Sequence, residues 1–147
     1  MQNLKKSDKI YFNKPQLKAA LVLANEEYHV LGRGTGKSSG ILAYRSRHNI
    51  ITMPRSCGYN VAESFAQILT RTLPSLVAGW AKLGLHRDVH YVIGKRPDKK
   101  WQNLWNWREP YEPPVGYDRF ISFFNGSGIH LISQDVKGGS LGLNTDW

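Results

Sequence analysis

The sequence is poor in cysteine, in long apolar runs and in acidic side chains. Cys57 is the one cysteine in 147 residues, so no intramolecular disulfide can form and a reducing compartment is favoured. No apolar run approaches the roughly 18 residues of a membrane span, and no signal peptide is recognisable, so we expect a cytoplasmic protein without a membrane segment. The 20 Lys and Arg residues outnumber 11 Asp and Glu, which gives a net charge of +9. This excess favours polyanionic partners, although nucleotide binding or solubility alone accounts for part of it.

The sequence also has little that suggests a zinc site or a nucleophilic triad. His86 and His90 are four residues apart, but no glutamate follows the first histidine and the segment leads into an apolar run. Cys57 has no base beside it in the sequence, and no carboxylate pair or serine triad has local support. Chemistry based on such groups is therefore not predicted.

The most informative stretch is a glycine-rich segment from Tyr28 to Arg47, YHVLGRGTGKSSGILAYRSR. Its order predicts a strand, a glycine loop and a helix. Glycine allows backbone N–H groups to approach a phosphate closely, because no Cβ is in the way. A helix beginning near Gly36 would point its positive end at the anion. The segment predicts a phosphate-binding loop, and the alternative is a glycine-rich turn that only packs.

The loop departs at one position from the pattern G-x-x-x-x-G-K-[ST]. Leu31 stands where the pattern has glycine, and the first glycine is Gly32. The rest of the pattern is present: Lys37 would lie near the β- and γ-phosphates, and Ser38 would offer its hydroxyl to Mg²⁺. We therefore expect ATP and Mg²⁺ as the ligands.

The remainder of the chain alternates expected helices and strands. Helices are expected over 15–24, 39–47, 61–73 and 74–83, strands over 28–31, 49–53, 90–93, 119–124 and 129–133, a loop over 55–59, and a hairpin turn over 125–128. This alternation predicts a single α/β domain over 1–147, with a mostly parallel sheet covered by helices on both faces.

Residues 95–117 are the least regular part of the sequence. They contain three tryptophans and four prolines, so we expect an excursion from the sheet. The tryptophans allow two interpretations, since indoles can stack on nucleic-acid bases or pack inside the protein. Basic residues that would accompany DNA contact, or form only a solvated face, lie here and near the N-terminus: Lys95, Arg96, Lys99, Lys100, Lys5, Lys6, Lys9, Lys14 and Lys18.

The order of these motifs resembles the N-terminal ATPase half of the phage terminase large subunit. The resemblance rests on four segments: Gln16 with GRGTGKSS, then ITMPRS, then FNGSGIHLISQD, then GGSLGLNTDW. It covers nearly the whole chain, although only the glycine loop is specific. It implies a P-loop ATPase fold and, in the full-length relative, ATP hydrolysis that drives the packaging of double-stranded DNA.

The resemblance also implies roles for individual residues. Gln16 would read adenine, with Tyr11 or Phe12 stacking on the base, although a helix-surface glutamine and apolar capping by the two rings are equally simple explanations. Arg33 would contact the γ-phosphate or respond to its loss, although an arginine that points to solvent or pairs with a carboxylate is an equally simple explanation. Lys37 would be the second catalytic cation. Backbone and hydroxyl contacts to the nucleotide would come from the remaining loop residues: Gly32, Gly34, Thr35, Gly36, Ser38 and Ser39.

In this family an apolar strand ending in Asp-Glu supplies the carboxylates for Mg²⁺ and for the attacking water. The sequence ends at Trp147, where such a strand would begin, so we expect an incomplete sheet and little or no turnover. Expected partners of the full-length relative are the small terminase subunit, the portal protein and further copies in a ring. The alternatives are another P-loop DNA motor, such as a helicase-like ATPase, and a non-enzymatic basic protein that associates with DNA.

Overall fold

The computed structural model describes residues 11–22 and 36–134. The described elements run in this order: α1 (Lys14–Leu21), η1 (Lys37–Leu42), α2 (Ala43–Thr52), β1 (Cys57–Ala62), α3 (Phe65–Gln67), η2 (Ile68–Thr72), α4 (Leu73–Lys82), β2 (Tyr91–Ile93), α5 (Lys99–Trp105), β3 (Phe120–Phe123) and β4 (Gly128–Ser133). η1 and η2 are π-helical turns that continue directly into α2 and α4. Within the described residues, no helix has both the length and the apolar character needed to cross a membrane.

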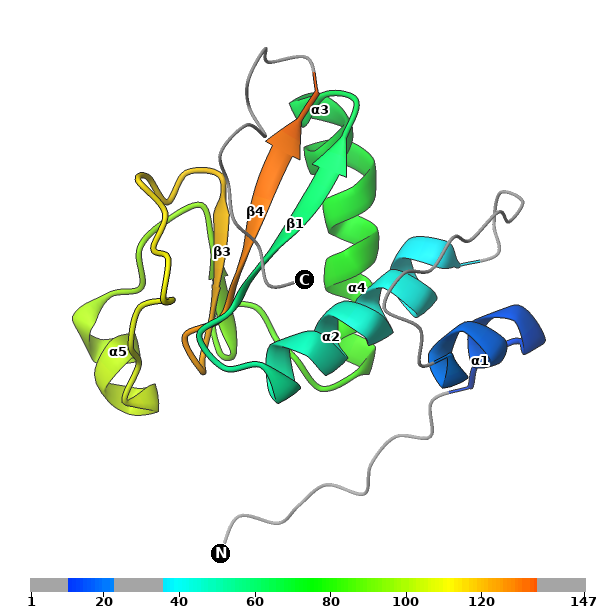
Figure 1. Ribbon diagram of the computed structural model, residues 1–147, viewed down its shortest axis with the longest axis horizontal. Coiled ribbons are helices and arrows are strands. Elements are labelled where there is room, and N and C mark those ends of the chain that lie inside the picture. Colours follow the sequence, from blue (N-terminus) through cyan, green and yellow to red (C-terminus); the bar gives the residue numbers. More distant parts are fainter. Residues whose placement is uncertain (1–10, 23–35, 135–147) are drawn as a thin grey trace, which may run out of the picture.

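The strands form one mixed sheet in the order β1-β4-β3-β2 (Figure 1). β1 and β4 pair in parallel, whereas β3 pairs antiparallel with both β4 and β2. The α/β class is confirmed, but the expectation of a mostly parallel sheet is wrong for the described strands. The physical reason is the short connection over 124–127, since neighbouring strands joined by a tight turn must run in opposite directions. The strand expected over 28–31 lies outside the described residues.

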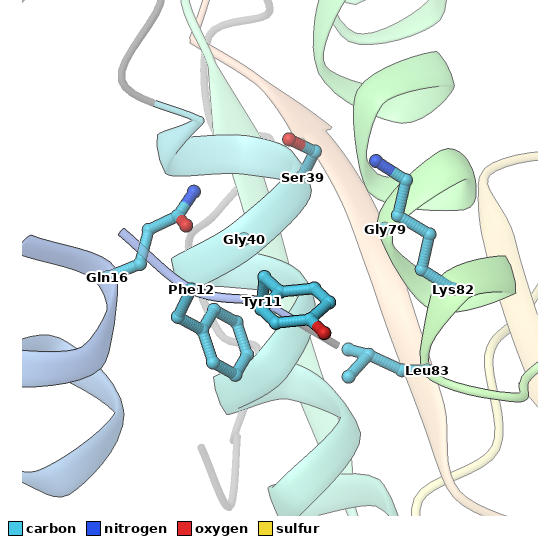
Figure 2. A pocket seen from close by; sticks show the side chains of 8 residues that line it. All are labelled: Tyr11, Phe12, Gln16, Ser39, Gly40, Gly79, Lys82 and Leu83. Carbon is cyan, nitrogen blue, oxygen red and sulfur yellow. The ribbon is translucent and has the colours of Figure 1, made fainter. Parts of the chain in front are cut away.

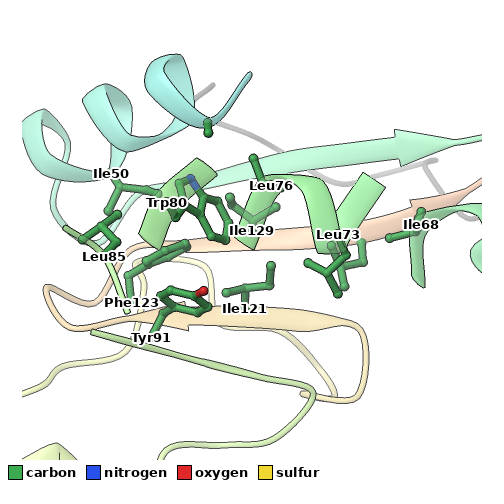
Figure 3. Packing of buried hydrophobic residues seen from close by; sticks show 12 residues of the cluster. Ile50, Ile68, Leu73, Leu76, Trp80, Leu85, Tyr91, Ile121, Phe123 and Ile129 are labelled. Atoms are coloured by element: carbon green, nitrogen blue, oxygen red, sulfur yellow. The ribbon is translucent and has the colours of Figure 1, made fainter. Parts of the chain in front are cut away.

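α2 and α4 pack together against one face of the sheet, and their contact forms the core (Figure 3). Trp80 of α4, Tyr91 of β2 and Phe123 of β3 are all fully buried. The Trp80 ring lies edge-on to the other two, with centroid separations of 5.1 Å and 5.2 Å. Its indole N–H donates to Ser46 Oγ of α2 at 3.0 Å, so the one polar atom of this side chain is satisfied.

The strand expected over 49–53 is wrong, because α2 continues through this segment to Thr52. Ile50 is buried and the adjacent Ile51 is 43% exposed, which is the one-sided burial of an amphipathic helix. The helix stops two residues before Pro54, in keeping with the bias of proline against a preceding helical residue. The side chain of Asn125 donates to the Ile50 carbonyl at 2.6 Å and so fastens this helix end to the hairpin.

The loop expected over 55–59 and the helix start expected at Val61 are also wrong. Both overlap β1, which pairs residue by residue with β4 from Cys57 opposite Gly128 to Ala62 opposite Ser133. The following helix begins at Phe65 and runs without interruption to Lys82, with Ser64 as its N-cap. Pro74 lies in the first turn of α4, directly after the π-helical turn, where its missing N–H interrupts the regular ladder.

The hairpin and the strand before the excursion are confirmed. β3 and β4 lie within the expected ranges 119–124 and 129–133 to within one residue, and β2 matches the run over 90–93. The excursion over 95–117 contains one short helix, α5, capped by Asp98 and followed by irregular chain. Gly94 adopts a positive φ of 70°, which allows the sharp exit from β2 into the excursion.

Candidate functional site

The helix expected after the glycine loop begins at Lys37. Gly36 precedes it with φ 73° and ψ 32°, a left-handed conformation that favours glycine. Among the described residues, no side-chain cap hydrogen bond is made at this helix start, and its first turn contains no acidic residue. Lys37 is exposed, and Ser38 and Ser39 are half-buried. The predicted site residues Gly32, Arg33, Gly34 and Thr35, and Leu31 before them, lie outside the described residues.

Gln16 connects the start of α1 to this helix. Its Oε1 accepts from the Asn13 backbone N–H at 3.0 Å, while Asn13 Oδ1 accepts from the Gln16 N–H at 2.9 Å. These two bonds form a capping box at the N-terminus of α1. The Gln16 Nε2 group donates to the Gly36 carbonyl at 3.3 Å. The structure therefore brings Gln16 next to Gly36. That Gln16 reads adenine remains a prediction.

The approach of Gln16 depends on two glycines. A Cβ on Gly36 or on Gly40 would lie 2.4 Å from Gln16 Nε2, which is closer than real atoms come. At Gly36 the left-handed backbone adds a second constraint. Gly40 was not among the predicted site residues. Its position one helical turn after Gly36 indicates that both glycines lie on the same helix face, and this was visible in the sequence.

On another side the same helix is in contact with α4. A Cβ on Gly79 would lie 2.2 Å from the Ser39 carbonyl oxygen and 2.5 Å from the Ala43 Cβ. Glycine at this position therefore allows the two helix backbones to approach each other closely. A glycine inside an otherwise apolar helical pattern is a sign of such packing, and this sign was available in the sequence.

An open cavity of about 70 Å³ lies between α1, η1 and the end of α4 (Figure 2). The chain before α1 forms part of its wall, and its lining mixes aromatic, amide, hydroxyl and ammonium groups with two glycines. The lining residues are Tyr11, Phe12, Gln16, Ser39, Gly40, Gly79, Lys82 and Leu83. Four of them, Tyr11, Phe12, Gln16 and Ser39, are candidates from the sequence, whereas Lys82 and Leu83 had no sequence signal beyond the end of a helix.

The two aromatic candidates differ in their surroundings. The Phe12 ring packs edge-on against Tyr44 of α2, with centroids 5.6 Å apart, so it already has an apolar partner. Tyr11 is 85% exposed at the cavity. A planar base could therefore stack on Tyr11 without displacing a packed ring.

The described residues contain no group of three or more His, Cys, Asp and Glu side chains that could hold a metal ion. Ser38, the predicted Mg²⁺ ligand, lies in the first turn of η1, where a hydroxyl can face an anion bound at the helix start. His86 and His90 contact each other: His90 Nδ1 accepts from the His86 backbone N–H at 3.0 Å. Burial, followed by the charge of His86, lowers the pKa of His90 below 6.5.

The tryptophans of the excursion serve internal packing. The indole N–H groups of Trp101 and Trp105 both donate to the Val89 carbonyl at 2.9 Å, and that of Trp107 donates to the Phe123 carbonyl at 3.0 Å. These bonds attach the excursion to the turn before β2 and to β3. Of the basic residues here, Arg96 forms an ion pair with Glu109 at 2.7 Å. The packing interpretation of the tryptophans is therefore favoured over base stacking.

Comparison with known proteins gives no relative: no family model, no curated protein and no solved structure matches this chain.

Proposed function

We propose that this chain is the ATP-binding part of a P-loop motor similar to the phage terminase large subunit, acting on double-stranded DNA in the host cytoplasm. The observation that carries the proposal is the meeting of Gln16 with Gly36, where the helix of the Gly-Lys-Ser segment begins. Two segments about 20 residues apart in the sequence, both expected to contact one nucleotide, lie next to each other beside an open cavity.

The described residues fit an adenine nucleotide on chemical grounds. The helix start at Lys37 offers backbone N–H groups and a positive dipole end to phosphate oxygens. A primary amide such as that of Gln16 has a donor and an acceptor side by side, which matches the amino group and ring nitrogen of adenine. The distance of 3.3 Å from Gln16 Nε2 to the Gly36 carbonyl is long for a hydrogen bond. The amide can therefore exchange this contact for a base at low cost.

In this proposal each residue binds or orients, and Mg²⁺ supplies charge neutralisation at the phosphates when it is bound. Lys37 pairs with the β- and γ-phosphates, Ser38 presents its hydroxyl to the metal ion, and Gln16 orients the base. Tyr11 stacks on the base. The full-length protein would couple hydrolysis to DNA movement within a homo-oligomeric ring that contacts the small subunit and the portal.

The test is the thermal midpoint of the purified chain with and without millimolar Mg-ATP, beside Lys37→Ala. Ligand at 100 times its Kd stabilises a protein by about 2.7 kcal/mol, which is several degrees for a domain of this size. We expect this shift in the wild type and its loss in Lys37→Ala, with the same midpoint for both without ligand. A cooperative wild-type transition that does not move with Mg-ATP would overturn the proposal.

Two alternatives stay distinguishable. A helicase-like motor with the same loop would bind ATP equally well, and only the activity of a longer chain on DNA ends separates it from a packaging motor. A basic protein whose loop no longer binds nucleotide would retain DNA in a gel-shift assay, unaffected by Lys37→Ala and by ATP. The excursion tryptophans do not favour this second alternative, because their indole N–H groups bond to backbone carbonyls of the protein itself.

A further inference from the structure

Lys82 forms part of the cavity wall that comes from α4, and nothing in the glycine-loop pattern involves it. It lies in the last turn of α4 and is exposed to solvent. Figure 2 shows its ammonium end and the Ser39 hydroxyl on the same side of the cavity, away from Tyr11 and Phe12. The cavity therefore has an aromatic end and a cationic end, with the Gln16 amide on the wall formed by α1.

This division matches the two halves of a nucleoside phosphate. A base is planar and apolar on its faces, so it suits the end with Tyr11, whereas the phosphate joined to the ribose is an anion that suits an ammonium group. The close contact of Gly79 with the Ser39 carbonyl holds the end of α4 against η1. Lys82, three residues after Gly79, is thereby kept beside the segment that carries Lys37 and Ser38.

We propose that Lys82 is a nucleotide-binding residue whose ammonium group bonds the α-phosphate. The inference rests on the proposed function, since it assumes that a nucleotide binds against the open mouth of this cavity and extends beyond it. In this inference a residue of α4 contacts the α-phosphate, while Lys37 contacts the β- and γ-phosphates. α4 then contributes directly to ligand affinity, in addition to its packing in the core. The competing explanation is that Lys82 only offsets the negative end of the α4 dipole.

The experiment measures the Kd of the purified chain for Mg-ATP and Mg-ADP by calorimetry in wild type, Lys82→Met, Lys82→Arg and Lys100→Met. Lys100 is an exposed lysine of α5 and serves as the matched control. We expect Lys82→Met to raise both Kd values by about tenfold or more, as for the loss of one charge-assisted hydrogen bond. The factor should be equal for ATP and ADP because both carry the α-phosphate. Lys82→Arg should retain most of the affinity, and Lys100→Met should match the wild type.

The outcomes separate the two proposals. If the wild type binds both nucleotides and Lys82→Met binds them equally well, the assignment of Lys82 is overturned and the nucleotide site stands. If the loss appears for ATP alone, Lys82 contacts the γ-phosphate and the α-phosphate assignment is overturned. If the wild type binds neither nucleotide, the proposed function itself fails. The thermal midpoint without ligand shows whether Lys82→Met is folded, and a change there without a change in Kd supports the dipole explanation.

Discussion

The helix from Lys37 to Thr52 takes part in two different kinds of packing. Near its start, the contacts involve small residues and one amide: the Gln16 side chain lies against Gly36 and Gly40, beside an open cavity. Nearer its end, Ile50 and the buried Ser46 meet the aromatic cluster around Trp80. The first region buries little apolar area and remains accessible, whereas the second excludes water. Changes in the first should therefore alter ligand binding, and changes in the second should alter the free energy of unfolding.

The largest effect is expected from Trp80→Ala. This change removes a fully buried ring that contacts Tyr91 and Phe123, and it leaves a cavity in the core. We expect the free energy of unfolding in urea to fall by about 3–5 kcal/mol. Leu104→Ala is the control, since Leu104 is 72% exposed on α5 and should change the value by less than about 0.5 kcal/mol. Equal losses in the two variants would contradict the assignment of the core.

A smaller and more local effect is expected at Gln16. Gln16→Ala removes the acceptor for the Asn13 N–H, while Asn13 Oδ1 still accepts from the backbone N–H of residue 16, so the amides of α1 should exchange hydrogen somewhat faster, by less than about 1 kcal/mol of local stability. Gln16→Glu keeps an acceptor for the Asn13 N–H but has no donor for the Gly36 carbonyl. We expect Gln16→Glu to retain the protection of α1 while it weakens Mg-ATP binding. Similar ATP affinity in Gln16→Glu and wild type would contradict a role of Gln16 in nucleotide binding and leave only its role in capping α1.

The smallest effect is expected from His130, in the sheet beside Phe120 and Tyr59. Burial lowers the pKa of His130 below its ordinary value of 6.5. The unfolded chain therefore binds more protons than the folded chain just below pH 6.5, and the free energy of unfolding should fall as the pH drops through this window. His130→Gln should flatten this decline in urea titrations between pH 7.5 and 5. An identical slope in wild type and His130→Gln would contradict the prediction.

The sequence predicts the sheet best where turn chemistry and β-branched residues coincide. The Asn125 to Gly128 turn and the apolar runs on either side of it gave β3 and β4 almost to the residue. The sequence-based prediction fails at β1, because Cys57 to Ala62 contains Gly58 and Asn60, which have low strand propensity. This segment is a strand because it pairs with β4, and nothing in its local sequence indicates that pairing.

The double isoleucine of α2 shows the opposite error. A short apolar run at Ile50 and Ile51 fits a buried strand as well as the end of a helix, and periodicity alone cannot separate them. At the candidate site, the order of glycine, lysine and serine predicted a helix beginning near Gly36, and the helix begins at Lys37. The contribution of Lys82 could not be predicted, since it reaches the cavity through the crossing of two helices that are distant in sequence, although Gly79 inside an apolar helical pattern was a sign of that crossing.

The contact between Gly79 and the Ser39 carbonyl has a mechanical consequence. The next residue, Trp80, is tied to Ser46 by its indole, so α4 is fastened to the helix after the loop at two points separated by two helical turns. These two attachments oppose sliding of one helix along the other, so the start of the helix at Lys37 and the part of α4 around Gly79 should move together. A displacement of the helix start would then reach Trp80 and, through it, the rings of Tyr91 and Phe123 in the sheet.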